Sequence, residues 1–492
     1  MTEAEGPATI PVEVGRGSPV ADPHSPAARL RDPVRRLLAR GTLYSSATAL
    51  QLVVGLVALP VITRLLTADE YGLIAVAMVI QLTLALLAAA GIPDILPRTY
   101  FRADGGPARA ASLVTLVACT AFGVALAAEF TGPWWARRLL GIGYGTPVRL
   151  AVWSSVAVAV LTAAQALLRA RDRARPFLLT AMLSMAGTQA AGVGLLLVWQ
   201  RTPTAYFTGI VLGNGAAAVT AVAASGFAVR PLAEPRFVRR TLLVSSPVVV
   251  SGLSFYLLWA GNRVVLNRLE GAAAAGRFQV AFLVGGLTIT FLNAIYLAWS
   301  PITFGVGDER RWQTLADTAR AVYTVAAAAA AAIALAAPAA LVVLAPADYK
   351  PRDLTTVSVI IALAAVPFAA YLANLQVLLW HGRTGRIAVV TASVAALNVA
   401  LTVALVHPFG LEGAAAATTA SFVVQALLLY TIAHRLAALP STRRALAAAT
   451  ALAAAGAAAA VVAPSNGPWL GLHLVAAVML VAWVVLRAVR LE

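Results

Sequence analysis

The stretch LPVITRLLTADEYGLIAVA, residues 59–77, places an arginine, an aspartate and a glutamate between two apolar runs. A short charged turn of this kind is typical of a helical hairpin that crosses a membrane twice. Arg64 ends the first run, where its aliphatic stem lets the guanidinium reach water. Asp69 and Glu70 begin the second run, where carboxylates interact favourably with the helix dipole. We therefore interpret this stretch as a corner between two membrane spans.

The composition extends this interpretation to the whole chain. Its 492 residues are 60% hydrophobic and only 12% charged, whereas soluble domains contain about 25% charged residues. Most of the surface must therefore face lipid. The net charge of +17 would favour a nucleic-acid partner in a soluble protein. In a membrane protein it indicates basic cytoplasmic loops, and we expect no nucleic-acid partner.

Apolar runs without strand-like alternation predict an all-α, polytopic membrane protein with about fourteen transmembrane helices. The expected spans are 43–66, 71–92, 111–129, 148–168, 177–199, 207–229, 242–266, 278–305, 321–345, 355–380, 387–406, 413–433, 445–463 and 468–486.

The distribution of basic residues predicts the orientation of these spans. With a cytoplasmic N-terminus, 27 of the 37 Lys and Arg residues fall on cytoplasmic segments. This excess follows the positive-inside rule and favours an even number of spans. We expect a multi-pass protein of the plasma membrane with both termini in the cytoplasm. Residues 1–40 are rich in Pro and Gly and are expected to form a disordered cytoplasmic tail.

The opening stretch recurs 204 residues later. In that register Arg64 aligns with Arg268 and Gly72 with Gly276. A second register, offset by 211 residues, aligns QALLRARDRAR (165–175) with QVLLWHGRTGR (376–386). Because six spans separate the copies, the two halves have the same orientation and surround a cavity on an axis along the membrane normal. We expect two pseudo-symmetric six-helix lobes plus two extra C-terminal helices.

The expected domains follow from this duplication. They are a cytoplasmic tail (1–40), an N-lobe with spans 1–6 (41–240), a C-lobe with spans 7–12 (241–440) and accessory spans 13–14 (441–492).

The motif LPVITRLLTADEYG resembles the first hairpin of the polysaccharide flippases of the multidrug/oligosaccharidyl-lipid/polysaccharide exporter superfamily. The matching residues are Pro60, Arg64, Leu65, Leu66, Glu70, Tyr71 and Gly72. Asn398 followed by GLEGAAAATTA (410–420) is similar to a second motif of that family. One departure is Asn262-Arg263, where the family tends to have Asp-Arg. The similar region extends over about residues 40–440.

The resemblance implies that the chain moves a polyprenyl-pyrophosphate-linked oligosaccharide from the inner to the outer leaflet by alternating access, for cell-surface polysaccharide biosynthesis. It also implies membrane lipids as partners, together with a polysaccharide polymerase and glycosyltransferases. We expect no enzymatic activity, no cofactor and no metal site, since the sequence contains no catalytic or phosphate-loop motif and its five His are scattered.

A pyrophosphate needs cations, and a sugar needs aromatic and polar side chains. In the seventh span Ser245, Gly252, Tyr256, Trp259 and Arg263 lie within a sector of roughly 60° of one helix. The candidate substrate-binding residues are Arg263, Arg98, Trp259, Tyr256, Arg64 and Asn262. Arg98 is placed to meet the pyrophosphate first. The alternative for Arg263, Trp259, Arg64 and Arg98 is an anchoring role at the membrane interface.

Three other functions remain open. A peptidoglycan-precursor flippase would use a similar cationic cavity. A cation-coupled multidrug exporter usually needs a carboxylate inside the membrane, and no Asp or Glu falls within an expected span other than Glu129 at the end of the third. A membrane glycosyltransferase would need acidic catalytic groups or large outer loops, and neither is present in the sequence.

Overall fold

The computed structural model of this chain describes residues 54–101, 106–226, 234–462 and 468–489. The expected tail (1–40) and the beginning of the first expected span lie outside these residues. The described residues form helices joined by short connections and contain no strand.

The first half of the described chain contains eight helices. In chain order these are the helix Val54–Leu65, α2 (Ala68–Ala89), α3 (Ile92–Tyr100), α4 (Gly106–Trp135), α5 (Thr146–Ala170), α6 (Ala174–Met182), α7 (Thr188–Val198) and α8 (Pro203–Ala224).

The second half continues the same pattern. Its helices are α9 (Pro235–Ala260), α10 (Asn262–Glu270), α11 (Ala272–Gly285), α12 (Leu287–Phe304), α13 (Asp308–Leu344), α14 (Leu354–Leu363), α15 (Ala365–Trp380), α16 (Thr384–Leu436), α17 (Arg443–Val462) and α18 (Pro468–Val489).

These helices confirm the predicted fold class, an all-α polytopic membrane protein. In the described residues, 11 helical segments are long and apolar enough to cross a membrane. One of them, α16, contains two expected spans, because Gly410 interrupts it with φ 52° and ψ −130°. The expected span 278–305 is broken at Gly286 into the end of α11 and all of α12. With the shorter helix Val54–Leu65 and with α18, the count agrees with about fourteen spans.

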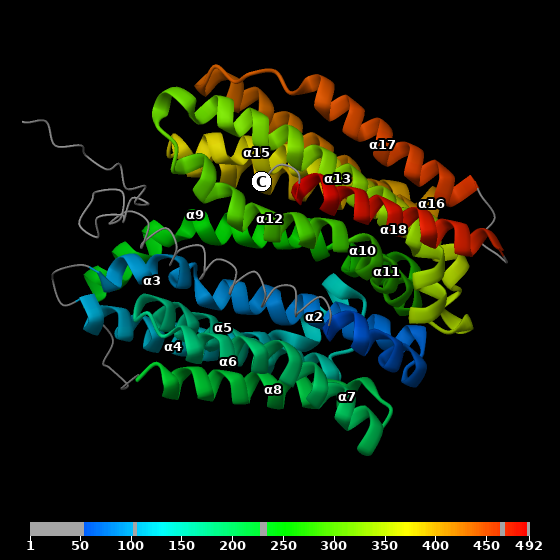
Figure 1. The fold of residues 1–492 in the computed structure, drawn as a ribbon. Coiled ribbons are helices and arrows are strands. Elements are labelled where there is room, and N and C mark those ends of the chain that lie inside the picture. The colour runs from blue at the N-terminus through cyan, green and yellow to red at the C-terminus, as the bar shows by residue number, and fades with distance from the viewer. Residues whose placement is uncertain (1–53, 102–105, 227–233, 463–467, 490–492) are drawn as a thin grey trace, which may run out of the picture. The chain divides into compact units, whose positions relative to one another are not determined.

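The helices gather into two bundles (Figure 1). Helices α2 to α8 pack mainly on one another, with α5 in contact with α2, α4 and α8. In the second bundle α13 packs on α14, α15, α17 and α18, and α16 packs on α9 and α15. The bundles touch where α2 runs beside α9, α10 and α11. The exact domain limits at residues 240 and 440 stay a prediction.

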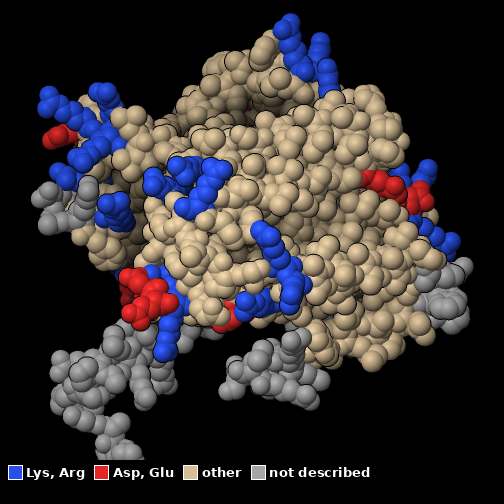
Figure 2. Space-filling view, turned by 90° about the horizontal axis from the view of Figure 1, so that it is seen from above, with Lys and Arg blue, Asp and Glu red and all other residues tan. Residues whose placement is uncertain are grey.

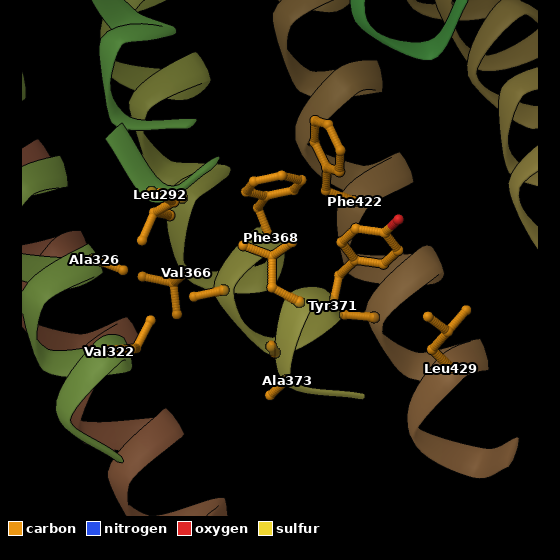
Figure 3. Close-up of a cluster of buried hydrophobic side chains, with 14 of the residues drawn as sticks. Leu292, Val322, Ala326, Val366, Phe368, Tyr371, Ala373, Phe422 and Leu429 are labelled. Carbon is orange, nitrogen blue, oxygen red and sulfur yellow. The ribbon is translucent and has the colours of Figure 1, made fainter. Parts of the chain in front are cut away.

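The second bundle has a continuous apolar core, shown in Figure 3. Leu292 of α12, Val322 of α13, Phe368 of α15 and Phe422 of α16 are all buried there. Phe368 meets Phe422 edge to face with ring centroids 5.3 Å apart. These contacts pack the second bundle into one unit. Helices α9 and α10 lie against this unit and are held in place by it.

The charges of the opening stretch build the corner between Val54–Leu65 and α2. Thr67 and Glu70 form a reciprocal capping box that satisfies the first amides of α2. Arg64 is exposed and donates to the carbonyl oxygens of Pro60 (2.9 Å) and Val343 (3.0 Å). We call this side of the molecule the Thr67 end, and the side at which α2 passes into α3 the Asp94 end.

Residues aligned by the 204-residue register meet at the Thr67 end. A Cβ atom on Gly72 would lie 1.8 Å from the carbonyl oxygen of Ala272, and one on Gly276 would lie 2.1 Å from that of Ala68. Asp69 Oδ1 accepts a hydrogen bond of 3.0 Å from the amide of Ala273, 204 residues away. The two copies of the motif therefore contact each other reciprocally, as a pseudo-twofold relation requires.

The surface suits a lipid environment. Figure 2 shows a face that is mostly uncharged, with Lys and Arg in separate patches and few Asp or Glu. Many large apolar side chains are exposed among the described residues, among them Val198, Phe130 and Val219. An exposed apolar area of this extent is expected on membrane-spanning helices.

Candidate functional site

The stripe predicted on the seventh span faces α2. At the Asp94 end, a Cβ on Gly91 would lie 2.9 Å from the carbonyl oxygen of Ser245. Nearer the Thr67 end, the Tyr256 hydroxyl donates to the carbonyl oxygen of Met78 at 3.4 Å. Trp259 of α9 and Arg263 of α10 lie on this same side, one before and one after Gly261, where α9 passes into α10. The predicted stripe therefore meets the turn after α2 at Ser245 and α2 itself at Tyr256.

A polar cavity of about 390 Å³ lies between these helices and the first bundle. It is bounded by the helix Val54–Leu65, α2, α5, the π-helical turn Leu183–Gly187, α7, α8, α9, α10 and α11. Its polar lining residues are Gln81, Ser184, Thr188, Gln189, Asn214, Tyr256, Trp259, Arg263 and Gln279. We call this space the polar cavity. Its lining offers amide, hydroxyl and aromatic groups together with one cation.

Arg263 is the cation of the polar cavity, and its side chain is only 6% exposed. Its Nε donates to the side-chain oxygen of Gln279, and its Nη1 donates to the carbonyl oxygen of Trp259 at 3.2 Å. The guanidinium also lies 4.3 Å from the ring centre of Phe282. None of the ion pairs formed by the described residues includes Arg263. An intramembrane cation without a carboxylate partner is costly and usually functional.

Aromatic packing fixes the position of the groups around Arg263. The indole of Trp259 meets Phe282 edge to face with ring centroids 4.4 Å apart. This contact holds the indole at the cavity wall, and Tyr256 lies one helical turn before it on the same side. Aromatic faces and nearby hydrogen-bonding groups are the usual means of holding a sugar ring, so the cavity can accept a saccharide.

The first bundle contributes a network of amides to the opposite wall. Ser154 of α5 accepts hydrogen bonds from Gln81 (2.9 Å) and from Asn214 (3.2 Å). Gln189 accepts one of 2.6 Å from the Tyr206 hydroxyl. These buried bonds hold three amide groups of α2, α7 and α8 in fixed orientations beside the cavity.

A second cavity of about 300 Å³ continues this space toward the Asp94 end. It shares Leu82 and Val158 with the polar cavity. Asp94, Gln165 and Arg169 line it, so it contains a cation and an acid. The guanidinium of Arg169 lies 5.6 Å from the ring centre of Phe177. We call this space the vestibule, because it lies between the Asp94 end and the polar cavity.

The structure separates the six predicted site residues. Arg263, Trp259 and Tyr256 line the polar cavity. Asn262 points into the second bundle, where its side chain donates to the Ala414 carbonyl oxygen (3.0 Å) and to Thr418 and accepts from Thr402 (3.1 Å). Arg64 is exposed at the Thr67 corner, and Arg98 is exposed on α3 outside the lining of either cavity. Ligand binding by all six residues stays a prediction.

Arg169 and Gln279 are candidate residues that the sequence reasoning missed. Arg169 had a detectable signal, because Val158, Thr162, Gln165 and Arg169 recur at helical spacing along α5, and all four line the vestibule. Gln279 is a lone amide in an Ala- and Val-rich helix. Nothing in its spacing shows that it lies beside Arg263.

Comparisons with solved structures place this arrangement among known transporter folds. The lipid II flippase MurJ in an inward closed conformation superposes with a TM-score of 0.70 at 11% identity, over 91% of this chain and 99% of MurJ. An inward-facing MATE multidrug transporter of the MOP superfamily gives 0.61 at 15% identity, over 82% and 96% of the two chains. A MOP superfamily transporter from Pyrococcus furiosus, reported to have a binding pocket of reverse polarity, gives 0.59 at 15% identity, over 82% and 95%.

At these identities the structural similarity shows the fold alone. No curated protein sequence matches the chain. Residues 37–305, more than half of the chain, match the family described as polysaccharide biosynthesis protein. The chain therefore belongs to that family, and it has the fold of the MOP superfamily transporters.

Proposed function

We propose that this transporter moves a polyprenyl-pyrophosphate-linked oligosaccharide from the inner to the outer leaflet of the plasma membrane by alternating access. The observation that carries this proposal is Arg263, a buried cation that has no carboxylate partner among the described residues and lies in a cavity lined by amides and aromatic rings. Such a site favours an anionic ligand with a saccharide head, because a phosphate group accepts paired hydrogen bonds from a guanidinium.

The positive-inside rule predicts the orientation of the protein in the membrane. It favours a cytoplasmic Asp94 end and an outer Thr67 end. The vestibule would then receive the pyrophosphate from the cytoplasmic side at Arg169. The polar cavity would hold the head deeper in the protein at Arg263. A glycosyltransferase on the inner side and a polymerase on the outer side are the partners that would supply and use such a substrate.

Replacement of Arg263 tests this function. We expect Arg263→Gln to lower transport of a fluorescent lipid-linked oligosaccharide in proteoliposomes at least tenfold, and Arg263→Lys to lower it less, because lysine keeps the charge but loses the paired geometry. The control is Arg240→Gln, an exposed arginine of α9, the helix that precedes α10. Transport by Arg263→Gln at the wild-type rate, with equal protein in the membrane, would contradict the proposal.

A peptidoglycan precursor is the alternative substrate, and the fold similarity to the lipid II flippase MurJ favours it. Both substrates carry a polyprenyl pyrophosphate, so Arg263 suits either. Transport of the two lipids in parallel, from the same reconstituted protein, distinguishes them. A multidrug exporter is less compatible with the cavity, because an unpaired arginine repels cationic drugs.

A further inference from the structure

A third cavity, of about 730 Å³, lies between α2, α4, α9, α10 and the first part of α16. Apart from Thr83, Thr131, Trp135 and Arg268, its lining residues carry only aliphatic side chains or none. Thr131 donates its hydroxyl to the Ala127 carbonyl oxygen at 2.6 Å. We call this space the apolar groove. Its lining suits a hydrocarbon chain, since it offers an occupant little hydrogen bonding.

The apolar groove adjoins the polar cavity. Val79 of α2 lines both spaces, and the neighbouring residues Ala260 and Gly261 line one each. The wall between the two spaces is therefore the line along which α2 meets α9 and α10. An amphiphile could place its polar head on one side of this line and its chain on the other without leaving the protein.

The charge at the rim of the groove also suits an anionic lipid. Arg268 lines the groove near the Thr67 end, is exposed, and donates from Nη1 to the Arg137 carbonyl oxygen at 3.2 Å. Arg137 and Arg138 follow α4 at the same end and are also exposed. A phosphate attached to a chain in the groove would meet these cations.

We propose that the apolar groove holds the polyprenyl chain of the transported lipid on the outer-leaflet side while the head leaves the polar cavity. This inference rests on the proposed function and adds the place of the chain. The occupant is a polyprenyl chain and not an ordinary membrane lipid, because the groove adjoins, across Val79, the polar cavity that we assign to the polar head.

Photolabelling of the full-length protein tests the occupant. The probe is a polyprenyl phosphate with a photoreactive diazirine in its chain, and the comparison probe is a phosphatidylglycerol with the same group in an acyl chain. We expect the polyprenyl probe to label α4, α10 and the first part of α16 at least fivefold more than the phospholipid probe does. Val403→Trp, which fills the groove, should lower this labelling at least fivefold.

Val423→Trp is the matched control. Val403 and Val423 lie on the same helix and are 42% and 41% exposed, but only Val403 lines the groove. Equal labelling by both probes, or unchanged labelling in Val403→Trp, would overturn the inference. This test can fail independently of the proposed function. If the protein does not transport the oligosaccharide, the groove can still be labelled. If the protein transports the oligosaccharide but the groove is not labelled, only the inference about the groove is contradicted.

Discussion

One buried arginine, Arg263, determines which kind of ligand the polar cavity can bind. Arg263 is held by Gln279, by the Trp259 carbonyl oxygen and by the ring of Phe282. Neutral groups such as these fix the side chain without neutralising its charge. A carboxylate at residue 262, as the family tends to have, would stand next to this cation in the chain. Asn262 instead belongs to a hydrogen-bonded cluster with Thr402 and Thr418, so the positive charge stays available to a ligand.

Arg169, the cation of the vestibule, gives a second prediction about a single residue. Arg169 and Arg98 are both exposed, but only Arg169 lines the vestibule. We expect Arg169→Gln to lower transport of the lipid-linked oligosaccharide about tenfold, and Arg98→Gln to lower it less than twofold. The measurement is the initial rate in proteoliposomes at several substrate concentrations. The reverse order of the two variants would show that Arg98 meets the pyrophosphate, as its place in the sequence suggests.

Sequence patterns locate some cavity residues because a helix repeats its face every 3.6 residues. Tyr256, Trp259 and Arg263 share one stripe, and the structure places them on one cavity wall. Gln81 and Asn214 could not be placed in this way, since each is an isolated amide whose neighbours come from other helices. Periodicity identifies the face of one helix but not which faces of two helices meet.

At the scale of elements, α2 and α11 approach each other closely at two glycines that the repeat aligns. The 204-residue register aligned Gly72 with Gly276 but did not show that they touch. The break in the expected span 278–305 falls at the pair Gly285-Gly286, a signal that the long apolar run around it hides. Small residues at a fixed register indicate close packing, and the partner helix is known only from the structure.

This contact predicts an intolerance to any side chain at Gly276. A Cβ there would lie 2.1 Å from the Ala68 carbonyl oxygen and 2.8 Å from the Gly72 amide nitrogen. Because both are backbone atoms, a helix must move, and overpacking of this kind costs about 1–3 kcal/mol. We expect Gly276→Ala to lower the Tm of the detergent-solubilised protein measurably.

The matched control for Gly276 is another helical glycine with free space around it. A Cβ on Gly194 of α7 would have no atom within 4 Å. Gly194→Ala should leave the Tm unchanged or raise it, because alanine favours a helix more than glycine does. An equal fall in Tm for both variants would show that helix geometry, and not the contact with α2, limits this position.

For the whole molecule, the closed contact at the Thr67 end and the cavities leading to the Asp94 end describe one state of a transporter with two bundles. If the bundles rock, the α2–α11 contact must open for the head to leave. We therefore expect Asp69→Cys with Ala273→Cys, joined by a short reversible thiol cross-linker, to stop transport. The parent protein would carry Cys119→Ser, which removes the chain's only cysteine. Addition of a reductant should restore the rate to that of the uncross-linked double variant.

A cross-link within one bundle provides the comparison. Arg277 and Asp353 both belong to the second half of the chain, and their side chains form an ion pair of 3.3 Å. Arg277→Cys with Asp353→Cys should cross-link as readily and leave transport near that of the same variant without the reagent. Both pairs restrain α11 at the Thr67 end, but only the first joins it to α2. Continued transport by the fully cross-linked Asp69→Cys, Ala273→Cys protein would mean that the head leaves by a route that does not separate the bundles at this end, and alternating access through the polar cavity would have to be abandoned.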